Sequence, residues 1–381
     1  MANKKSFKEK YLFNPNKYIL ATLLILSVSS FFFIDTASFR SESSPNNEHI
    51  FEAEITQIIS ERDATESDIT LISTSKIQEL LAKIDIENTT KQITVINEFN
   101  SLTPGDKVFV RTNSLGEANE FYEIIAVSRY NGLLLLAIFF ALLVFATSGK
   151  KGFNAFIGLV FSFSIIFTFI VPQILSGENP ITTSLIGAIT ILFGTFYISY
   201  GFNKKSMSAL IGIAITLIFV GLLSNILVGT MSFTGNATEE VSFIFFAAKN
   251  TISLIGLLIA GIIIAAIGVL DDVAITQASV VSELVSTDSS LSKSQLFKKA
   301  MSLGKDHISA VINTLILAYT GASLPLVMLF FLGNYPLGYV VSNELIAEEI
   351  LRTLIASSGL VLAVPLTTLV AVILFKKPRY N

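Results

Sequence analysis

The sequence contains no cysteine and no tryptophan, and only two of its 381 residues are histidine. Without cysteine the chain can form no disulfide, no thiolate-ligated zinc or iron–sulfur centre and no thiol nucleophile. Two histidines exclude a multi-histidine metal site. We therefore expect no bound cofactor, and the sequence does not identify a metal ion.

Charged residues are also scarce, at 14% of the chain, whereas 52% of the residues are hydrophobic. A soluble globular protein usually carries about 25% charged residues. This composition indicates a protein whose main partner is the lipid bilayer. Nucleic acid is not an expected partner.

Long apolar runs account for this composition, and a helix needs roughly 20 apolar residues to cross the hydrocarbon core. Eight runs approach or exceed that length, which predicts about eight transmembrane helices. They are Tyr18–Ile34, Gly132–Ser148, Phe153–Leu175, Ile181–Phe202, Met207–Thr230, Thr251–Leu270, Ile308–Leu332 and Arg352–Phe375. The first run could instead be a cleaved signal peptide, because small residues follow it at Thr36-Ala37-Ser38.

The distribution of lysine and arginine predicts the orientation of the chain. Basic residues precede the first run, recur at Lys150-Lys151, at Lys204-Lys205 and between Lys293 and Lys305, and end the chain at Lys376–Arg379. With an even number of crossings, all of these segments lie in the cytoplasm together with both termini. The predicted location is a bacterial plasma membrane.

The predicted organisation follows from these runs. It comprises a cytoplasmic basic N-terminus (1–17), a first transmembrane helix (18–34), an extracytoplasmic domain (35–130), a core of seven transmembrane helices (131–375) and a cytoplasmic basic tail (376–381). The core includes a cytoplasmic amphipathic segment at 271–306.

The segment between the first two runs is polar and predicts a small β-rich, barrel-like α+β domain. Alternating residues predict a strand at Phe51–Ile59, and Thr103–Asp106 predicts a turn. Ser75 with Gln78 has the spacing of a capping box, and Ile77, Leu80, Leu81 and Ile84 follow at helical spacing, which predicts a short helix. Four further strands are expected at Ile69–Ser73, Gln92–Glu98, Asp106–Arg111 and Phe121–Ser128.

Two adjacent carboxylates, Asp271 and Asp272, end the sixth run and are the strongest candidate for chemistry. Carboxylates at a helix C-terminus oppose the helix dipole, so we expect the span to end near Gly268 and one aspartate to cap a new helix. From Asp272 the spacing then places acidic and hydroxyl side chains on one stripe, namely Asp272, Thr276, Ser279 and Glu283. That stripe suits a hard cation or a proton. The alternative is that the aspartates only cap a helix at the membrane boundary.

Two further groups are candidates on the cytoplasmic and outer sides. Asp306 is expected to cap the seventh span, His307 could titrate near neutral pH, and Asn313 needs a partner on a neighbouring helix. On the outer side Glu348 and Arg352 are four residues apart, in the favourable order for a helical ion pair, with Glu349 beside them. Caps and interfacial anchors are the structural alternatives for both groups.

Other signals of catalysis are missing from the sequence. It has no Gly-x4-Gly-Lys-Ser/Thr phosphate loop, and its outer histidine, His49, lies in a predicted linker. We therefore do not expect an enzyme.

Three stretches, Gly268–Glu283, Ala300–Phe330 and Glu344–Leu369, together resemble the YibE/F family of multi-spanning bacterial membrane proteins. Many members carry the Asp-Val-Ala found here at Asp272–Ala274. The resemblance extends from Gly132 to Phe375. It implies a plasma-membrane location and the same architecture, but no substrate.

The sequence thus predicts a polytopic α-helical membrane protein with a small extracytoplasmic domain. The leading hypothesis is a secondary transporter or permease, ion- or proton-coupled, that moves a small ion or solute through a site near the aspartate pair. The alternative is a receptor or scaffold whose outer domain binds an envelope partner, with or without homo-oligomerisation.

Overall fold

The computed structural model describes residues 49–63, 76–86, 89–98, 101–112, 121–248 and 251–376. The predicted first span Tyr18–Ile34, the N-terminal segment, the predicted strand Ile69–Ser73 and the end of the basic tail lie outside these ranges. The chain divides into two compact units, Arg40–Ala146 and a second that includes Thr147–Asn381. Each unit is described by itself.

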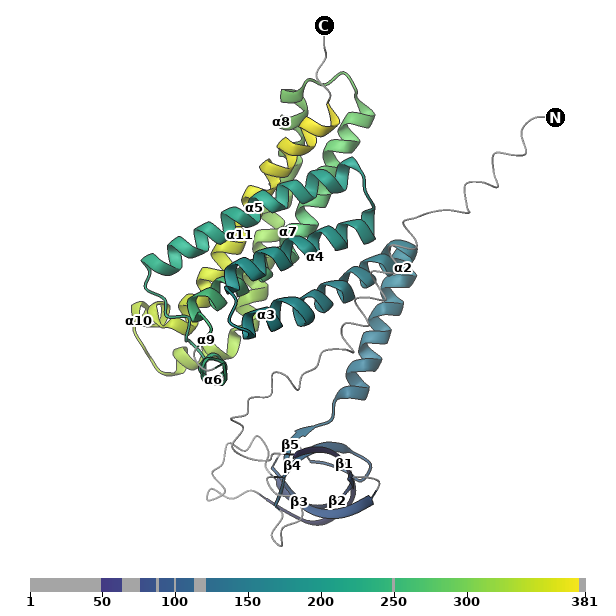
Figure 1. Cartoon of the computed structure of the whole chain (residues 1–381), viewed down its shortest axis with the longest axis vertical. Helices are drawn as coiled ribbons and strands as arrows, with labels where there is room; N and C mark the ends of the chain where they lie inside the picture. The colour runs from purple at the N-terminus through teal and green to yellow at the C-terminus, as the bar shows by residue number, and fades with distance from the viewer. Residues whose placement is uncertain are drawn as a thin grey trace, which may run out of the picture. The chain divides into compact units, whose positions relative to one another are not determined.

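The first unit contains a closed five-stranded β-barrel (Figure 1). Its strands are β1 (His49–Asp63), β2 (Lys76–Ile86), β3 (Thr89–Asn97), β4 (Lys107–Thr112) and β5 (Tyr122–Val127). They follow one another around the barrel in the order β1-β2-β3-β5-β4. The β3–β5 pair is parallel and the other four pairs are antiparallel. Because β4 returns to lie beside β1, the topology is a Greek key.

Four of the predicted strands and the predicted turn are confirmed within the described ranges. The turn is closed by a 3.1 Å hydrogen bond from the Asp106 backbone N–H to the Thr103 carbonyl oxygen. Gly105 at its centre has φ of +97°, a conformation that glycine adopts without steric penalty.

The predicted helix at Ile77–Ile84 is wrong, because β2 occupies this segment. Gln78, Leu80, Ala82 and Ile84 alternate along β2 and are buried. Pairing with β1 on one side and β3 on the other satisfies the backbone of β2. These long-range hydrogen bonds outweigh a local periodicity that fits either structure.

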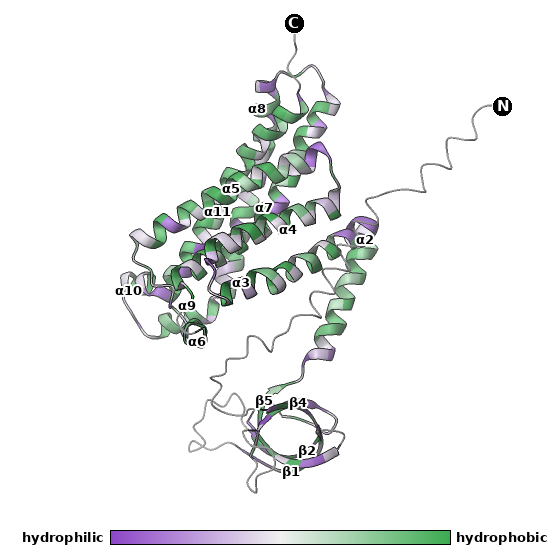
Figure 2. Cartoon of the chain, viewed as in Figure 1, coloured by the Kyte–Doolittle hydropathy of each residue, from purple (hydrophilic) through white to green (hydrophobic). Residues whose placement is uncertain are grey.

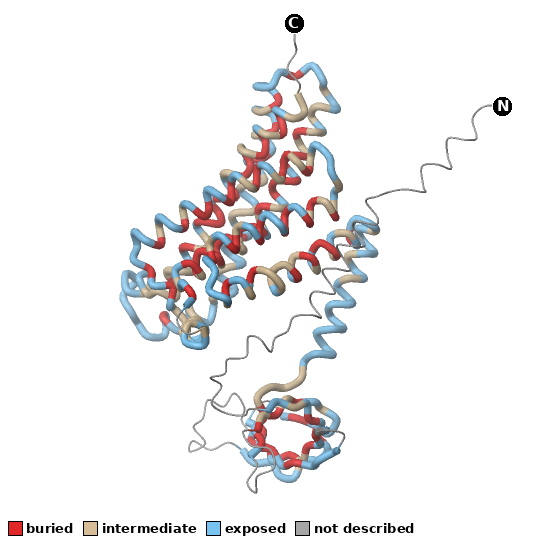
Figure 3. The backbone as a smooth tube through the Cα atoms, in the orientation of Figure 1, coloured by how far each residue is buried: buried red, intermediate tan, exposed pale blue. Residues whose placement is uncertain are grey.

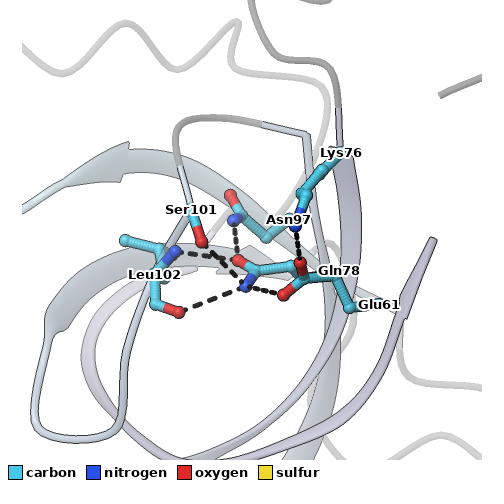
Figure 4. Close-up of polar contacts among 6 residues, drawn as sticks. All are labelled: Glu61, Lys76, Gln78, Asn97, Ser101 and Leu102. Atoms are coloured by element: carbon cyan, nitrogen blue, oxygen red, sulfur yellow. Dashed lines mark hydrogen bonds and ion pairs between the residues drawn. The ribbon is translucent and has the colours of Figure 1, made fainter. Parts of the chain in front are cut away.

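A buried glutamine, Gln78, organises one end of the barrel (Figure 4). Its amide oxygen accepts hydrogen bonds of 2.8 Å from Asn97 Nδ2 and from the Leu102 backbone N–H. Its amide nitrogen donates to the Leu102 carbonyl oxygen and to Ser101 Oγ, both at 3.2 Å, and to Glu61 at 3.1 Å. The side chain therefore pairs with a backbone segment as another strand would, and fixes the β3–β4 connection.

The rest of the described chain is helical. The helices are α2 (Tyr130–Ile165), the π-helical turn η3 (Ile166–Ile170), α3 (Val171–Leu175), α4 (Pro180–Tyr200), α5 (Lys204–Thr230), α6 (Glu239–Ala247), α7 (Leu254–Thr287), α8 (Lys293–Ala322), α9 (Leu324–Leu332), α10 (Leu337–Ser342) and α11 (Glu344–Phe375).

Five helical segments of the described chain are long and apolar enough to cross a membrane, or six if a bent pair is one span. The five are Tyr130–Leu175 and the helices α4, α5, α7 and α11. Tyr130–Leu175 has 46 residues, or about 69 Å at ~1.5 Å per residue, more than twice the ~30 Å of one crossing. Gly149 breaks its helical geometry (φ 53°, ψ −133°) between the two spans predicted there.

The predicted span Ile308–Leu332 is not one straight helix. It is divided between α8 and α9, which meet at an angle of 62°. Pro325 lies in the first turn of α9 and lacks the N–H that a continuous helix would need. The sequence prediction joined the two helices because both are apolar.

The second unit is a helical bundle with α7 near its centre (Figure 1). This helix packs against α4, α5, α8 and α11. The largest fully buried side chains of α7 are Ile259, Ile262, Ile263 and Leu270. Many exposed side chains of the bundle are apolar, as a comparison of Figures 2 and 3 shows. Apolar side chains on both the inside and the outside of a bundle are typical of helices surrounded by lipid.

Small residues bring α5 and α11 close together. A Cβ atom added to Gly212 of α5 would lie 2.9 Å from Cα of Thr367 in α11. Likewise, a Cβ atom added to Gly359 of α11 would lie 2.6 Å from Val220 of α5. At Gly212 the two backbones approach each other, and at Gly359 the glycine makes room for the side chain of Val220.

Candidate functional site

Asp271 and Asp272 do not cap a helix, because α7 runs without interruption from Leu254 to Thr287. Its N-cap is Ser253, whose hydroxyl oxygen accepts a 3.1 Å hydrogen bond from the Gly256 N–H. Residues on both sides of the aspartates are buried against neighbouring helices, so packing carries the helix through them. The dipole penalty that suggested a break acts only in the last turn of a helix.

The helix instead ends at Asp288, which forms a local turn. Its carboxylate accepts hydrogen bonds of 2.5 Å from Ser290 Oγ and 2.9 Å from the Ser290 N–H. These bonds, with a smaller contribution from Lys299 and Lys376, hold the pKa of Asp288 below its ordinary value. Lys376 also donates a 2.6 Å hydrogen bond to the Ser289 carbonyl oxygen and thereby ties the end of α11 to the α7–α8 loop.

The predicted polar stripe is present on α7. Asp272, Thr276 and Glu283 are exposed and Ser279 is partly buried, whereas Ala274, Ala278 and Val281 on the other side are buried. Within the described ranges, no three His, Asp or Glu side chains come together in a way that could bind a metal ion. Because Asp272, Thr276 and Glu283 are exposed, the stripe lies on the outside of the bundle.

Asp271 faces a different direction and lines a cavity of about 370 Å³. We call this space the Asp271 cavity. It lies between α2, α4 and α7, and its polar wall consists of Asp271, Ser162, Thr195, Ser199 and Tyr200. Consecutive residues on a helix are about 100° apart, which explains why Asp272 does not line it.

Oxygen atoms dominate the polar wall of the Asp271 cavity. The hydroxyl hydrogen of Ser162 is donated to the Gly158 carbonyl oxygen at 2.9 Å, and that of Thr195 to the Leu192 carbonyl oxygen at 3.1 Å. Both hydroxyls therefore have only lone pairs left to offer the cavity. Tyr200 adds a phenol oxygen to the same wall. The arrangement suits a positively charged or proton-donating guest.

The candidates predicted to lie on the cytoplasmic side, Asp306, His307 and Asn313, do not line this cavity. The predicted cap at Asp306 is wrong, because α8 begins at Lys293 with a capping box formed by Ser292 and Gln295. Leu296, Ala300 and Gly304 are buried and extend the helix upstream. Asn313 is exposed, contrary to the prediction that it contacts a neighbouring helix.

His307 has a buried Nε2 atom with no hydrogen-bond partner among the described residues. It belongs to α8 and does not line the Asp271 cavity.

The outer candidates form an ion pair with a different partner from the one predicted. Arg352 Nη1 contacts Glu349 Oε1 at 2.5 Å, three residues away, instead of Glu348. Glu348 Oε1 and Arg352 Nε are buried without a hydrogen-bond partner in the described chain. The preceding acidic residue, Glu344, accepts hydrogen bonds from the Thr234 and Gly235 backbone N–H groups at 2.6 and 3.0 Å. It fixes the loop after α5 to the start of α11.

One interhelical contact was missed by the sequence analysis. The buried Gln277 of α7 donates hydrogen bonds to Thr368 Oγ1 of α11 at 2.7 Å and to the Ala300 carbonyl oxygen of α8 at 3.0 Å. A signal for it existed, because Gln277 lies beside Ala278 on the side of the helix opposite the predicted polar stripe. A polar side chain on such a face has to find a partner.

Comparison with known proteins gives a family but no close relative. The model of the family described as YibE/F-like protein matches residues 136–377. Searches of curated proteins and of solved structures found no match to the chain.

Proposed function

This chain belongs to the YibE/F-like family, and we propose that it is a secondary transporter or permease that binds a small ion or solute in the Asp271 cavity. The proposal includes coupling to protons or to a monovalent cation. It also includes a bacterial plasma-membrane location with both termini in the cytoplasm.

The observation that carries the proposal is the carboxylate of Asp271 in the wall of a half-open cavity between α2, α4 and α7 of the apolar bundle. An ionisable side chain in a membrane-spanning helix is costly unless it faces a polar interior, and such residues often mark pathways for ions or protons. A volume of about 370 Å³ is within the ~300–1,000 Å³ of sites for small molecules.

The wall of the cavity favours one class of guest over another. Ca²⁺ usually takes six to eight oxygen ligands that include several carboxylates. The Asp271 cavity offers one carboxylate and several hydroxyl oxygens. We therefore favour a proton, a monovalent cation or a small cationic solute as the bound species.

The test is flux into liposomes that contain the purified protein, under an imposed pH gradient and membrane potential. Asp271→Asn keeps the shape of the side chain and removes its charge, and we expect it to lower flux at least tenfold. Asp272→Asn is the matched control, because it makes the same change one residue away, outside the cavity. Equal flux by Asp271→Asn and wild type would reject the site. Absence of flux by folded wild-type protein would reject transport.

A second candidate function rests on the closed barrel of the first unit. A five-stranded Greek-key barrel is the architecture of the OB fold, whose members bind oligonucleotides and oligosaccharides on the β2–β3 face. Here that face carries polar exposed residues such as Lys83, Gln92 and Thr94. This is an analogy at the level of fold, and it supports a receptor or scaffold that binds an envelope partner. Deleting residues 40–123 distinguishes the two functions, because a transporter would keep some flux.

A further inference from the structure

A second cavity lies at the bend between α8 and α9, where the first turns of α11 form the opposite wall. Its volume is about 220 Å³. We call it the bend cavity. No residue is shared with the wall of the Asp271 cavity. The bend exists because Pro325 prevents α8 from continuing, so the break in the helix creates the space.

The wall of the bend cavity is divided between polar and apolar side chains. The polar ones are Tyr319, Thr320 and Ser323 at the end of α8, and Glu349 and Thr353 on α11. The remaining wall consists only of isoleucine, leucine and valine side chains. A cavity lined in this way fits a molecule that is itself part polar and part apolar.

The polar wall accepts hydrogen bonds and carries little net charge. Glu349 is held at 2.5 Å by Arg352, which does not itself line the cavity. Thr353 donates its hydroxyl hydrogen to the Glu349 carbonyl oxygen at 2.8 Å, so its oxygen keeps only lone pairs for a guest. The hydroxyls of Tyr319, Thr320 and Ser323 can both donate and accept. A neutral or positively charged head that carries hydroxyl or amine donors therefore fits the polar wall.

The apolar wall opens to the outside of the bundle. Ile316 is 42% exposed and Leu354 is 57% exposed. Elsewhere on α9, Leu329 is 64% and Phe331 is 87% exposed. In a membrane such a surface faces lipid, so a guest would enter from the bilayer.

We propose that the bend cavity binds the head and first methylenes of a single-chain amphiphile whose head group donates hydrogen bonds. About 220 Å³ equals roughly seven water volumes at ~30 Å³ each, so the rest of the chain remains in the bilayer. Tyr319, Thr320 and Glu349 receive the head, and Ile316 and Leu354 contact the chain. This site does not depend on transport through the Asp271 cavity.

The absence of tryptophan from the chain makes a direct test possible. Leu354→Trp places the only indole of the protein in the cavity wall, and Ile316→Trp places it on the facing helix as a second reporter. Leu329→Trp is the control, because residue 329 is exposed to lipid but does not line the cavity. Each full-length variant is reconstituted in liposomes and titrated with a monoacylglycerol that carries bromine, a quencher of tryptophan fluorescence, near its head group.

We expect saturable quenching at low mole fraction for the two cavity reporters and a linear response for Leu329→Trp. Adding Thr320→Val, which removes a hydroxyl at constant shape, should shift the half-saturation point at least fivefold for Leu354→Trp. Linear quenching of both cavity reporters would overturn the proposal, because it indicates bulk lipid only. Equal saturation by a brominated fatty acid, whose head is anionic, would overturn the assignment of the head group.

Discussion

The side chain of Gln78 holds one end of the barrel together through its hydrogen bonds. It is fully buried and satisfies both backbone groups of Leu102 and the amide of Asn97. Replacing it by leucine keeps its size but removes the side-chain partner of the Leu102 N–H and carbonyl groups, each at a penalty of about 1–3 kcal/mol.

We therefore expect Gln78→Leu to destabilise the barrel by about 2–5 kcal/mol, in line with two or more unpaired buried groups. Hydrogen exchange of the full-length protein should become faster in peptides covering 101–110. The control is Gln92→Leu on the exposed face of β3, which should leave exchange there unchanged. Unaltered protection in Gln78→Leu would show that the β3–β4 connection is held by other contacts.

A second residue-scale prediction concerns pH. Hydrogen bonds from Lys76, at 2.5 Å, and from Gln78 lower the pKa of Glu61, and the pairing with Glu61 raises the pKa of Lys76. Because the carboxyl pKa is lowered, the pair stabilises the fold above the ordinary glutamate pKa of about 4.3. This stabilisation is lost as pH falls through the pKa of Glu61 in the folded protein. Because the lysine pKa is raised, the pair stabilises the fold below the ordinary lysine pKa of about 10.4. This stabilisation is lost as pH rises through the pKa of Lys76 in the folded protein.

Opening of the β1–β2 pair, followed by hydrogen exchange corrected for the intrinsic pH dependence, should therefore be rarest between about pH 5 and pH 10. Glu61→Gln should remove the acid-side dependence while the barrel stays closed. If the wild type and Glu61→Gln respond identically to acid, the pair does not contribute to the pH dependence. The two side chains are partly exposed, so the effect should shrink in high salt.

At the scale of elements, the contact between α5 and α11 depends on Gly212. A Cβ atom at this position would clash with the Thr367 hydroxyl and lie 2.9 Å from the Thr367 Cα atom, which a rotamer change cannot relieve. We expect Gly212→Ala to lower stability by about 1–3 kcal/mol, as overpacking usually does. Thermal unfolding in detergent measures this change.

The matched control is Gly261→Ala in α7, where an added Cβ atom would meet nothing within 4 Å. Alanine has the higher helix propensity, so this variant should be neutral or slightly more stable. Equal behaviour of the two variants would mean that α5 and α11 are free to separate.

The elements also show what the sequence could and could not predict. Alternation and the Thr103–Asp106 turn identified four of the described strands, because both signals are local. The β2 strand was misread, since Ile77 and Ile84 fit helical spacing and only pairing with β1 and β3 decides the structure. The end of α7 was misplaced for a related reason, because its continuation depends on packing against α8 and α11.

The same reasoning applies to the candidate site. The sequence identified Asp271, but not its cavity, because Ser162, Tyr200 and Asp271 come from three helices far apart in the chain. It identified Arg352, but helical spacing alone allows both Glu348 and Glu349 as partners. The partners of a contact within one helix can be narrowed to a few residues from the sequence. A site between helices can be identified only once the packing of the helices is known.

At the scale of the whole molecule, the predicted topology can be tested because the chain has no cysteine. The barrel is predicted to lie outside the cell and the α7–α8 loop inside. Thr94→Cys, on the outer surface of β3, should react with a membrane-impermeant maleimide in intact cells. Ser289→Cys, exposed in the α7–α8 loop, should react only after the membrane is permeabilised. Reaction of both in intact cells, or the reverse pattern, would contradict the orientation inferred from the basic residues.

The unbroken course of α7 has a mechanical consequence. At about 1.5 Å per residue its 34 residues form a rod of about 51 Å, with Asp271 at its middle. The helix contains no proline and no π-helical turn, the usual causes of a kink, so we expect it to tilt or rotate as a whole. Any guest that turns α7 at the Asp271 cavity therefore also moves its far end, where Lys376 holds Ser289. A change in the occupancy of the Asp271 cavity would therefore change the position of the α7–α8 loop.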